Sequence, residues 1–118
     1  MKEILERIAD LEGVKGVWIY EGDKCEEKLA IPLDLNTIHA LKDVFSRLFA
    51  TFKNSNLDEL VGCISEYDYF IFKKIETKWL VVWAKKTTSF SLLKMEIEII
   101  LNDIIQKKDS LFKKLKFW

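Results

Sequence analysis

The sequence predicts an α/β (α+β) fold: a five-stranded antiparallel sheet with the element order helix-strand-strand-helix-strand-strand-strand-helix. Two patterns predict it: three segments carry apolar residues at helical spacing, and five short runs rich in β-branched and aromatic residues lie between them. Of the 118 residues 49% are hydrophobic, with only four Gly and one Pro. This composition is enough for one core and argues against a disordered or linker-like chain.

The first and second helices are predicted at residues 2–12 and 36–53. In the first, Gly13 is the expected stop, and in the second Asp34 or Asn36 is the expected cap. One apolar set recurs through the second helix with 3-4 spacing: Ile38, Leu41, Phe45, Leu48 and Phe52. Val44 and Phe49 widen this stripe. It indicates either a deeply buried helix or one that packs on its own sheet and also on a partner helix.

The strands are predicted at residues 14–20, 26–31, 59–66, 69–75 and 78–84. Pro32 follows the second strand and favours an edge position for it, because proline cannot donate a ladder hydrogen bond. Both alternating residue sets of 78–84 are apolar, which predicts a strand covered on both faces or placed at the sheet centre.

The last helix is predicted from residue 90, after possible caps at Thr88, Ser89 and Ser91, to residue 108. We therefore expect a domain at residues 1–108 and a basic amphipathic tail at 109–118. In the tail, either the last helix runs on or Asp109 and Ser110 start a new one. The tail's apolar residues share one helical face and form a candidate partner-binding set: Leu111, Phe112, Leu115 and Trp118. They could fold back onto the domain, dock on a second subunit or partner groove, or lie on an anionic membrane surface, the less favoured interpretation.

The sequence offers no catalytic, cofactor or metal site. It has one His, His39, and two Cys, Cys25 and Cys63, in no ligand-type spacing, and it lacks nucleotide-binding glycine motifs. The 19 basic and 19 acidic residues balance, which counts against a nucleic-acid partner. The longest fully apolar run, residues 79–84, is too short to span a bilayer, and no signal peptide is visible. We expect a non-enzymatic, cytoplasmic protein that binds other proteins.

Several landmarks together resemble the Roadblock family, the light-chain class first associated with dynein. The run from Leu11 to Val17, LEGVKGV, is similar to the family's opening into its first strand, and Gly22 follows in the next turn. The central helix and the strand pair 69–84 leading into the last helix match in position. The passage from the last strand to the last helix, residues 88–91 (TSFS), departs from the family in having no glycine.

This resemblance implies a homodimer, or a heterodimer with a similar chain. Sheets would join through the first strand after the central helix, and the two central helices would pack together. The interface implied is Ile38, Leu41, Phe45, Leu48, Phe52, Leu60, Val61, Gly62, Cys63, Ile64 and Ser65. The resemblance also implies a scaffold or regulator of a Ras-like small GTPase with no catalysis of its own. The alternative is a small-molecule-binding sensor module built on a similar sheet.

Overall fold

The computed structural model describes residues 2–52, 59–63 and 66–116, and all side chains in these ranges except Leu60, Cys63 and those of residues 108–116. Its elements follow the predicted order. The bounds are α1 Lys2–Ala9, β1 Val14–Glu21, β2 Lys24–Leu29, α2 Leu35–Phe52, β3 Glu59–Cys63, β4 Asp68–Ile75, β5 Lys78–Lys85 and α3 Phe90–Lys116.

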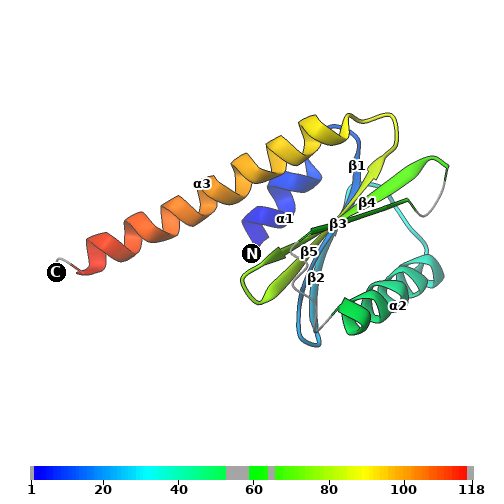
Figure 1. The fold of residues 1–118 in the computed structure, drawn as a ribbon, viewed down its shortest axis with the longest axis horizontal. Coiled ribbons are helices and arrows are strands. Elements are labelled where there is room, and N and C mark those ends of the chain that lie inside the picture. Colours follow the sequence, from blue (N-terminus) through cyan, green and yellow to red (C-terminus); the bar gives the residue numbers. More distant parts are fainter. Residues whose placement is uncertain (1, 53–58, 64–65, 117–118) are drawn as a thin grey trace.

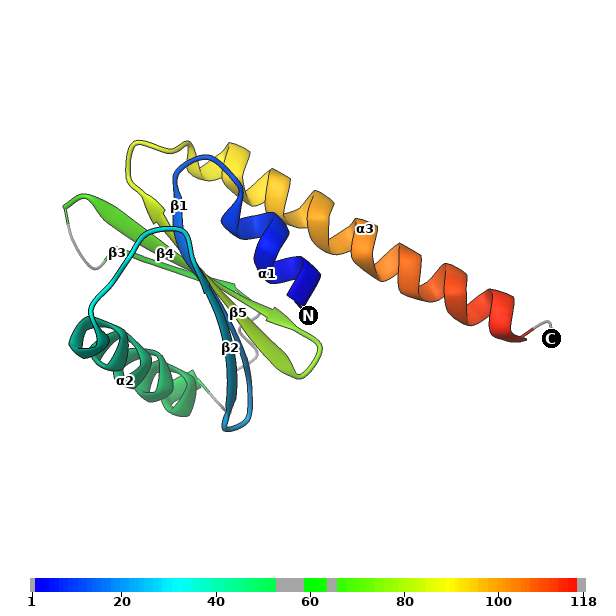
Figure 2. The same cartoon turned by 180° about the vertical axis from the view of Figure 1, so that it is seen from behind.

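The five strands form one antiparallel sheet in the order β2-β1-β5-β4-β3 (Figure 1). The central place of β5 confirms the prediction made from its two apolar faces, and β2 lies at an edge as Pro32 suggested. The two views agree that α1 and α3 cover one face of the sheet and that α2 covers the other (Figures 1 and 2).

Each face has its own core, because side chains alternate between the two sides of a strand. The face under α1 and α3 is aliphatic, with Ile8, Val17, Val82, Leu93 and Ile97 all buried. The face under α2 is aromatic; its fully or nearly fully buried residues include Trp18, Tyr20, Phe45, Phe70, Phe72 and Trp83. The ring of Phe45 makes edge-on contacts with those of Trp18, Tyr20, Phe70 and Phe72 at centroid distances of 5.2–6.2 Å.

Local chemistry sets the helix starts. The Asp34 carboxylate accepts a hydrogen bond from the Thr37 amide at 2.6 Å, so Asp34 rather than Asn36 caps α2. The Ser89 hydroxyl accepts one from the Leu92 amide at 3.4 Å and caps α3. Helix α3 then continues unbroken to Lys116, which selects the first of the two alternatives for the tail.

Several predicted boundaries differ from the structure, three of them for reasons that the contacts or the described ranges explain. Helix α1 ends at Ala9 instead of Glu12, because turns after Ile8 lead the chain to Gly13, whose φ is +86°. Strand β2 begins at Lys24, two residues early, because the tight Gly22-Asp23 turn pairs Glu21 directly with Lys24. Strand β3 ends at Cys63; the rest of its predicted range includes residues 64 and 65, which lie outside the described residues.

Candidate protein-interaction site

The two edges of the sheet differ in chemistry. Four of the six residues of β2 are charged, and charged side chains discourage pairing with another strand. Only one residue of the five in β3 is charged, Glu59. Within the described residues β3 pairs on one side only, with β4. The β3 edge is therefore the one whose side chains least oppose addition of a further strand.

Two described residues of β3, Val61 and Gly62, are only partly covered, whereas Glu59 is paired with Lys94 of α3 at 3.2 Å. Val61 lies opposite Ile71 and therefore projects on the side of α1 and α3, where 44% of it is exposed. Gly62 lies opposite Phe70, on the α2 side, and a β-carbon built on it would meet no atom within 4 Å. Among the described residues, none therefore covers the sheet directly at Gly62 on the side of α2.

Helix α2 turns an apolar flank towards this end of the sheet. The Lys42 amine lies 3.4 Å from the Glu27 carboxylate of β2, so that flank of the helix faces β2. Val44 comes two residues later, about 200° further round the helix, and hence on the opposite flank. Val44 is 41% exposed and Leu41 and Leu48 beside it are half-buried. A partly exposed apolar strip, of which Val44 is the most exposed member, therefore runs along α2 on the flank nearer β3 and β4.

The predicted interface residues of α2 fall into two groups. Phe45 has no exposed surface, so a second chain could reach it only after rearrangement. Ile38, Leu41, Leu48 and Phe52 are half-buried. Within α2, all of which the structure describes, Phe45 is the only fully buried residue, so the first of the two alternatives, a deeply buried helix, does not hold for the single chain. On β3, the side chains of Leu60 and Cys63 and all of Ile64 and Ser65 lie outside what the structure describes.

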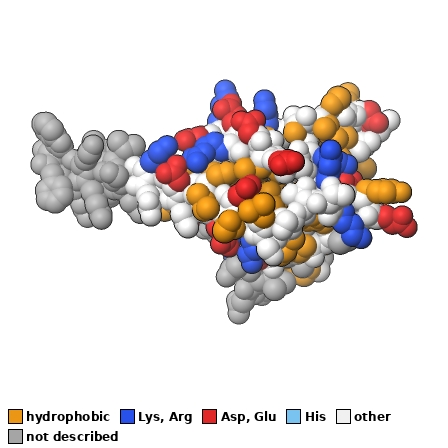
Figure 3. Space-filling model, turned by 90° about the horizontal axis from the view of Figure 1, so that it is seen from above, with side chains coloured by type: hydrophobic (Ala, Val, Ile, Leu, Met, Phe, Trp, Pro, Cys, Tyr) orange, Lys and Arg blue, Asp and Glu red, His pale blue; other side chains and the backbone are white. Residues whose placement is uncertain are grey.

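The tail residues Leu111 to Lys116 lie on the helical backbone of α3, and Trp118 lies outside the described residues. Figure 1 shows the last turns of α3 extending past α1 and past the end of the sheet, without turning back. Seen from above, the surface that α1 and the first part of α3 present carries mixed hydrophobic and charged side chains (Figure 3).

Two groups that could support covalent catalysis, His39 and Cys25, are poorly placed for it, and the side chain of Cys63 lies outside what the structure describes. His39 is exposed on α2 and Cys25 is half-buried on β2. Burial raises the pKa of the Cys25 thiol, whereas a nucleophilic cysteine needs a lowered one. Among the described residues, no group of three His, Cys, Asp or Glu side chains could hold a metal ion. None of the described helices is long and apolar enough to cross a membrane.

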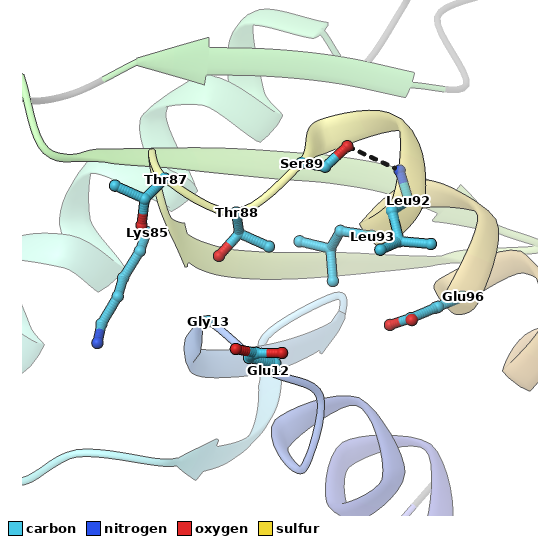
Figure 4. Close-up of a pocket in the computed structure, with 9 residues that line it drawn as sticks. All are labelled: Glu12, Gly13, Lys85, Thr87, Thr88, Ser89, Leu92, Leu93 and Glu96. Atoms are coloured by element: carbon cyan, nitrogen blue, oxygen red, sulfur yellow. Dashed lines mark hydrogen bonds between the residues drawn. The ribbon is translucent and has the colours of Figure 1, made fainter.

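A cavity of about 340 Å³ lies where the α1–β1 turn meets the start of α3 (Figure 4). Its polar lining consists of Glu12, Lys85, Glu96 and the hydroxyls of residues 87–89, with no histidine or cysteine. Gly13 lies opposite Thr88 there, so the turn before β1 is in close contact with the turn before α3. We assign the cavity no chemistry.

A second cavity, of about 550 Å³, lies at the C-terminal end of α2. Its walls include the rings of Tyr20, Phe49, Phe52 and Trp79, with Lys74 also in the lining. The Phe49 and Trp79 rings stack with centroids 5.5 Å apart. This arrangement provides an apolar concave surface between two hairpin turns and a helix end.

No protein-family model matches the chain, and no curated protein matches it in sequence. Solved structures do match its fold. A Roadblock/LC7 domain from Streptomyces avermitilis superposes with a TM-score of 0.62 at 11% identity, over 91% of this chain and 92% of that one. MglC from Myxococcus xanthus gives 0.56 at 15%, over 90% and 97%. The gliding protein MglB from Thermus thermophilus gives 0.58 at 18%, over 84% and 81%.

These likenesses cover nearly the whole length of each chain, so they concern one complete fold rather than a shared fragment. The chain has the Roadblock fold, as the LEGVKGV opening and the element order suggested. At these identities the agreement concerns the architecture alone.

Proposed function

We propose that this protein is a dimeric, non-catalytic binding module that scaffolds or regulates a Ras-like small GTPase in the cytoplasm. The observation that carries the proposal is the combination of an open, nearly uncharged β3 edge with an apolar flank of α2 on the same side of the sheet. Edge pairing through β3 would remove an exposed strand edge, and the strip at Leu41, Val44 and Leu48 would gain a cover.

The second copy is a fitting occupant because the surface is self-complementary. An antiparallel β3–β3 pair would follow a two-fold axis, which brings the same flank of both α2 helices together. Gly62 offers no side chain that would hold the second helix away. One solved MglB structure is described as a tetrameric arrangement, with a TM-score of 0.53 at 18% identity, over 84% of this chain and 80% of that one. Self-association is thus compatible with the fold.

The dimer is tested with Val44→Glu. A charge on the exposed strip should reduce the mass measured by sedimentation at micromolar concentration to that of one chain. Ser46→Glu is the matched control, because Ser46 is an exposed residue of the same helix on the other flank. A wild-type protein that is already monomeric, or equal effects of both substitutions, would count against the proposed interface.

The GTPase role rests on the resemblance to the Roadblock family, whose members commonly bind Ras-like proteins. If the chain alters a GTPase rate, we expect it to order the GTPase's own catalytic groups. Arg7 lies 2.7 Å from the Asp103 carboxylate, and Arg47 lies 3.1 Å from that of Asp43. Arg7 is thereby held against α3, whereas the pair of Arg47 is an exposed contact within its own helix, and we assign neither arginine a catalytic role.

The GTPase role is tested by affinity capture from native lysate with a GTP analogue and, in parallel, with GDP. Retention of an identified Ras-like protein in one nucleotide state supports a regulator, and the preferred state indicates its direction. Equal capture in both states would favour a scaffold. If no Ras-like protein is retained, the GTPase part of the proposal is withdrawn while the dimer remains open to its own test.

The aromatic cavity at the end of α2 favours a second candidate, a sensor module for a small apolar ligand. Aromatic walls and a few polar groups are common features of such sites. A co-purifying ligand that raises the melting temperature in the wild type, but not after Phe49→Ala, would support it. Purified protein without such a ligand and without any thermal shift on screening would remove this alternative.

A further inference from the structure

We propose that the outer face of α3 is a contact surface for a second copy of this chain, and that the two α3 helices pack in parallel and in register. Helices α3 and α2 cover opposite faces of the sheet (Figures 1 and 2). The contact is therefore separate from the proposed interface at β3 and α2, and it adds a second step of self-association.

Helix α3 carries two apolar rows within residues 90–107, where the structure describes its side chains. The row that faces the sheet is buried and consists of Leu93, Ile97, Ile100 and Ile104. The other row contains Leu92, Met95 and Ile99, which are 49%, 51% and 57% exposed. These three lie within about 60° of one another, on the side of the helix away from the buried row. A helix that only covers a sheet needs no aligned apolar residues on its outer side, so this row requires its own explanation.

The outer row has the spacing of a helix–helix contact. Leu92, Met95, Ile99, Asn102 and Gln106 follow one another at alternating steps of three and four residues. Two helices interlock their side chains at this spacing in a coiled coil. These five residues are the α3 seam. Asn102 and Gln106 are exposed, and their amides both donate and accept hydrogen bonds. In a parallel pair each residue of the seam faces its own copy, so each amide meets a group with which it can pair.

The charges around the α3 seam favour a second copy as its occupant. No residue of the seam is charged, although charged residues make up 32% of the chain. Low charge and exposed methionine are typical of the centres of protein interfaces. Three of the four charged residues between positions 91 and 106 are paired within the chain: Lys94 with Glu59 at 3.2 Å, Glu98 with Lys73 at 3.4 Å and Asp103 with Arg7 at 2.7 Å. The fourth, Glu96, lines the cavity beside Glu12. A strongly acidic or basic partner would find little counter-charge here, whereas a second copy presents a matching uncharged seam.

The α3 seam is short, so the contact should be weaker than that of a stable dimer. Its apolar part consists of three side chains that are each about half exposed in the single chain. Contacts that bury little surface are commonly transient. We therefore expect association at roughly 0.1–1 mM, above the micromolar range in which the β3 interface is tested.

Sedimentation of the full chain from about 1 μM to about 1 mM measures this step. The mass should about double towards the upper end of the range. Met95→Glu should abolish the increase, because it places a charge in the apolar part of the seam. Ile105→Glu is the matched control, since Ile105 is 43% exposed but lies about 120° round the helix from Ile99. No increase in the wild type, or an equal loss in both variants, would overturn the proposal.

Val44→Glu separates this contact from the proposed dimer at β3 and α2. The variant should lose association at micromolar concentration and keep the increase towards 1 mM, whereas Met95→Glu should do the reverse. Failure of the Val44→Glu prediction alone concerns the β3 interface. If Met95→Glu lowers the mass at micromolar concentration, the seam belongs to the main dimer and the proposal of a second contact is wrong.

Disulfide cross-linking tests the parallel register. In a Cys25→Ser, Cys63→Ser background, Met95→Cys alone and Ile99→Cys alone should each form a covalent dimer under mild oxidation, because a parallel pair brings each position beside its own copy. Ile105→Cys should stay monomeric on denaturing gels. The seam and control positions are exposed, so these substitutions should leave the melting temperature unchanged. A covalent dimer that forms only when the Met95→Cys and Ile99→Cys proteins are mixed would overturn the parallel arrangement.

Discussion

Gly13 packs directly against Thr88, and there is no room between them for a side chain. A β-carbon built on Gly13 would overlap the Thr88 hydroxyl and would lie 2.9 Å from the Thr88 β-carbon. Gly13 also has a φ of +86°, which L-residues other than glycine rarely adopt. The contact joins the turn before β1 to the turn before α3.

Replacing Gly13 by alanine should destabilise the protein by about 2–4 kcal/mol, since backbone strain and steric overlap both act at this position. Urea unfolding measures the change. Adding Thr88→Gly should recover the part due to overlap but not the part due to φ. Gly22→Ala is the matched control: its φ is +60°, but an added β-carbon would meet no atom within 4 Å. It should cost only about 1 kcal/mol, and equal losses at the two glycines would contradict the packing argument.

Phe45 is the residue of α2 on which the aromatic core depends. It is fully buried and contacts four rings, so Phe45→Ala should lower the free energy of unfolding by about 3–5 kcal/mol. Val44→Ala, one residue earlier and 41% exposed, should change the stability of the single chain by less than about 1 kcal/mol. Denaturant titration at a concentration where the protein is monomeric checks both. A large loss for Val44→Ala under that condition would mean that its flank is covered within the chain.

The order and type of the elements could be predicted from the sequence because each depends on local periodicity. The central place of β5 could also be predicted, since Trp79–Ala84 is apolar on both faces. The sequence could not tell which apolar residues of α2 pack over the sheet and which lie on its flank beside β3. Phe45 and Leu48 have the same spacing pattern, and only the order of the strands decides which of them lies over the sheet and which lies on the flank beside β3.

Contacts between segments far apart in the chain could not be predicted from the sequence either. The residues flanking Lys15 and Asp68 in the sequence do not indicate that these two side chains are in contact. They are close in space only because β1 and β4 lie on either side of β5. The end of α1 was misplaced for a related reason. The sequence predicts a helix stop at Gly13, whereas the residue lies four positions after the end of α1 and packs against Thr88, far along the chain.

Lys15 and Asp68 form a largely buried ion pair across the sheet, with the amine 2.7 Å from the carboxylate. The amine also lies 5.0 Å from the centroid of the Trp83 ring, which itself stacks on Phe70. Lys15→Met should cost about 1–3 kcal/mol, because it removes the cation that offsets the carboxylate charge. Asp68→Asn should cost a similar amount, and the double variant should cost less than the sum. Strictly additive losses in a double-mutant cycle would show that the two side chains do not interact.

Stability should fall at acid pH through two carboxylates, that of Asp34, which caps α2, and that of Asp103 in the middle of α3. The Thr37 amide, donating to Asp34, holds the pKa of that carboxyl below its usual value, and the Arg7 guanidinium does the same for the pKa of Asp103. A lowered pKa in the folded state means that the stabilisation is present above the unfolded pKa of about 4 and is lost as the pH falls through the folded value. Melting temperatures measured from pH 7 to pH 2.5 should therefore drop below about pH 4. Asp34→Ser keeps a capping oxygen that does not titrate, and Asp103→Asn removes the other carboxylate, so each variant should lose less stability over this range than the wild type. Acid curves for both variants that run parallel to the wild type would assign the loss to other groups.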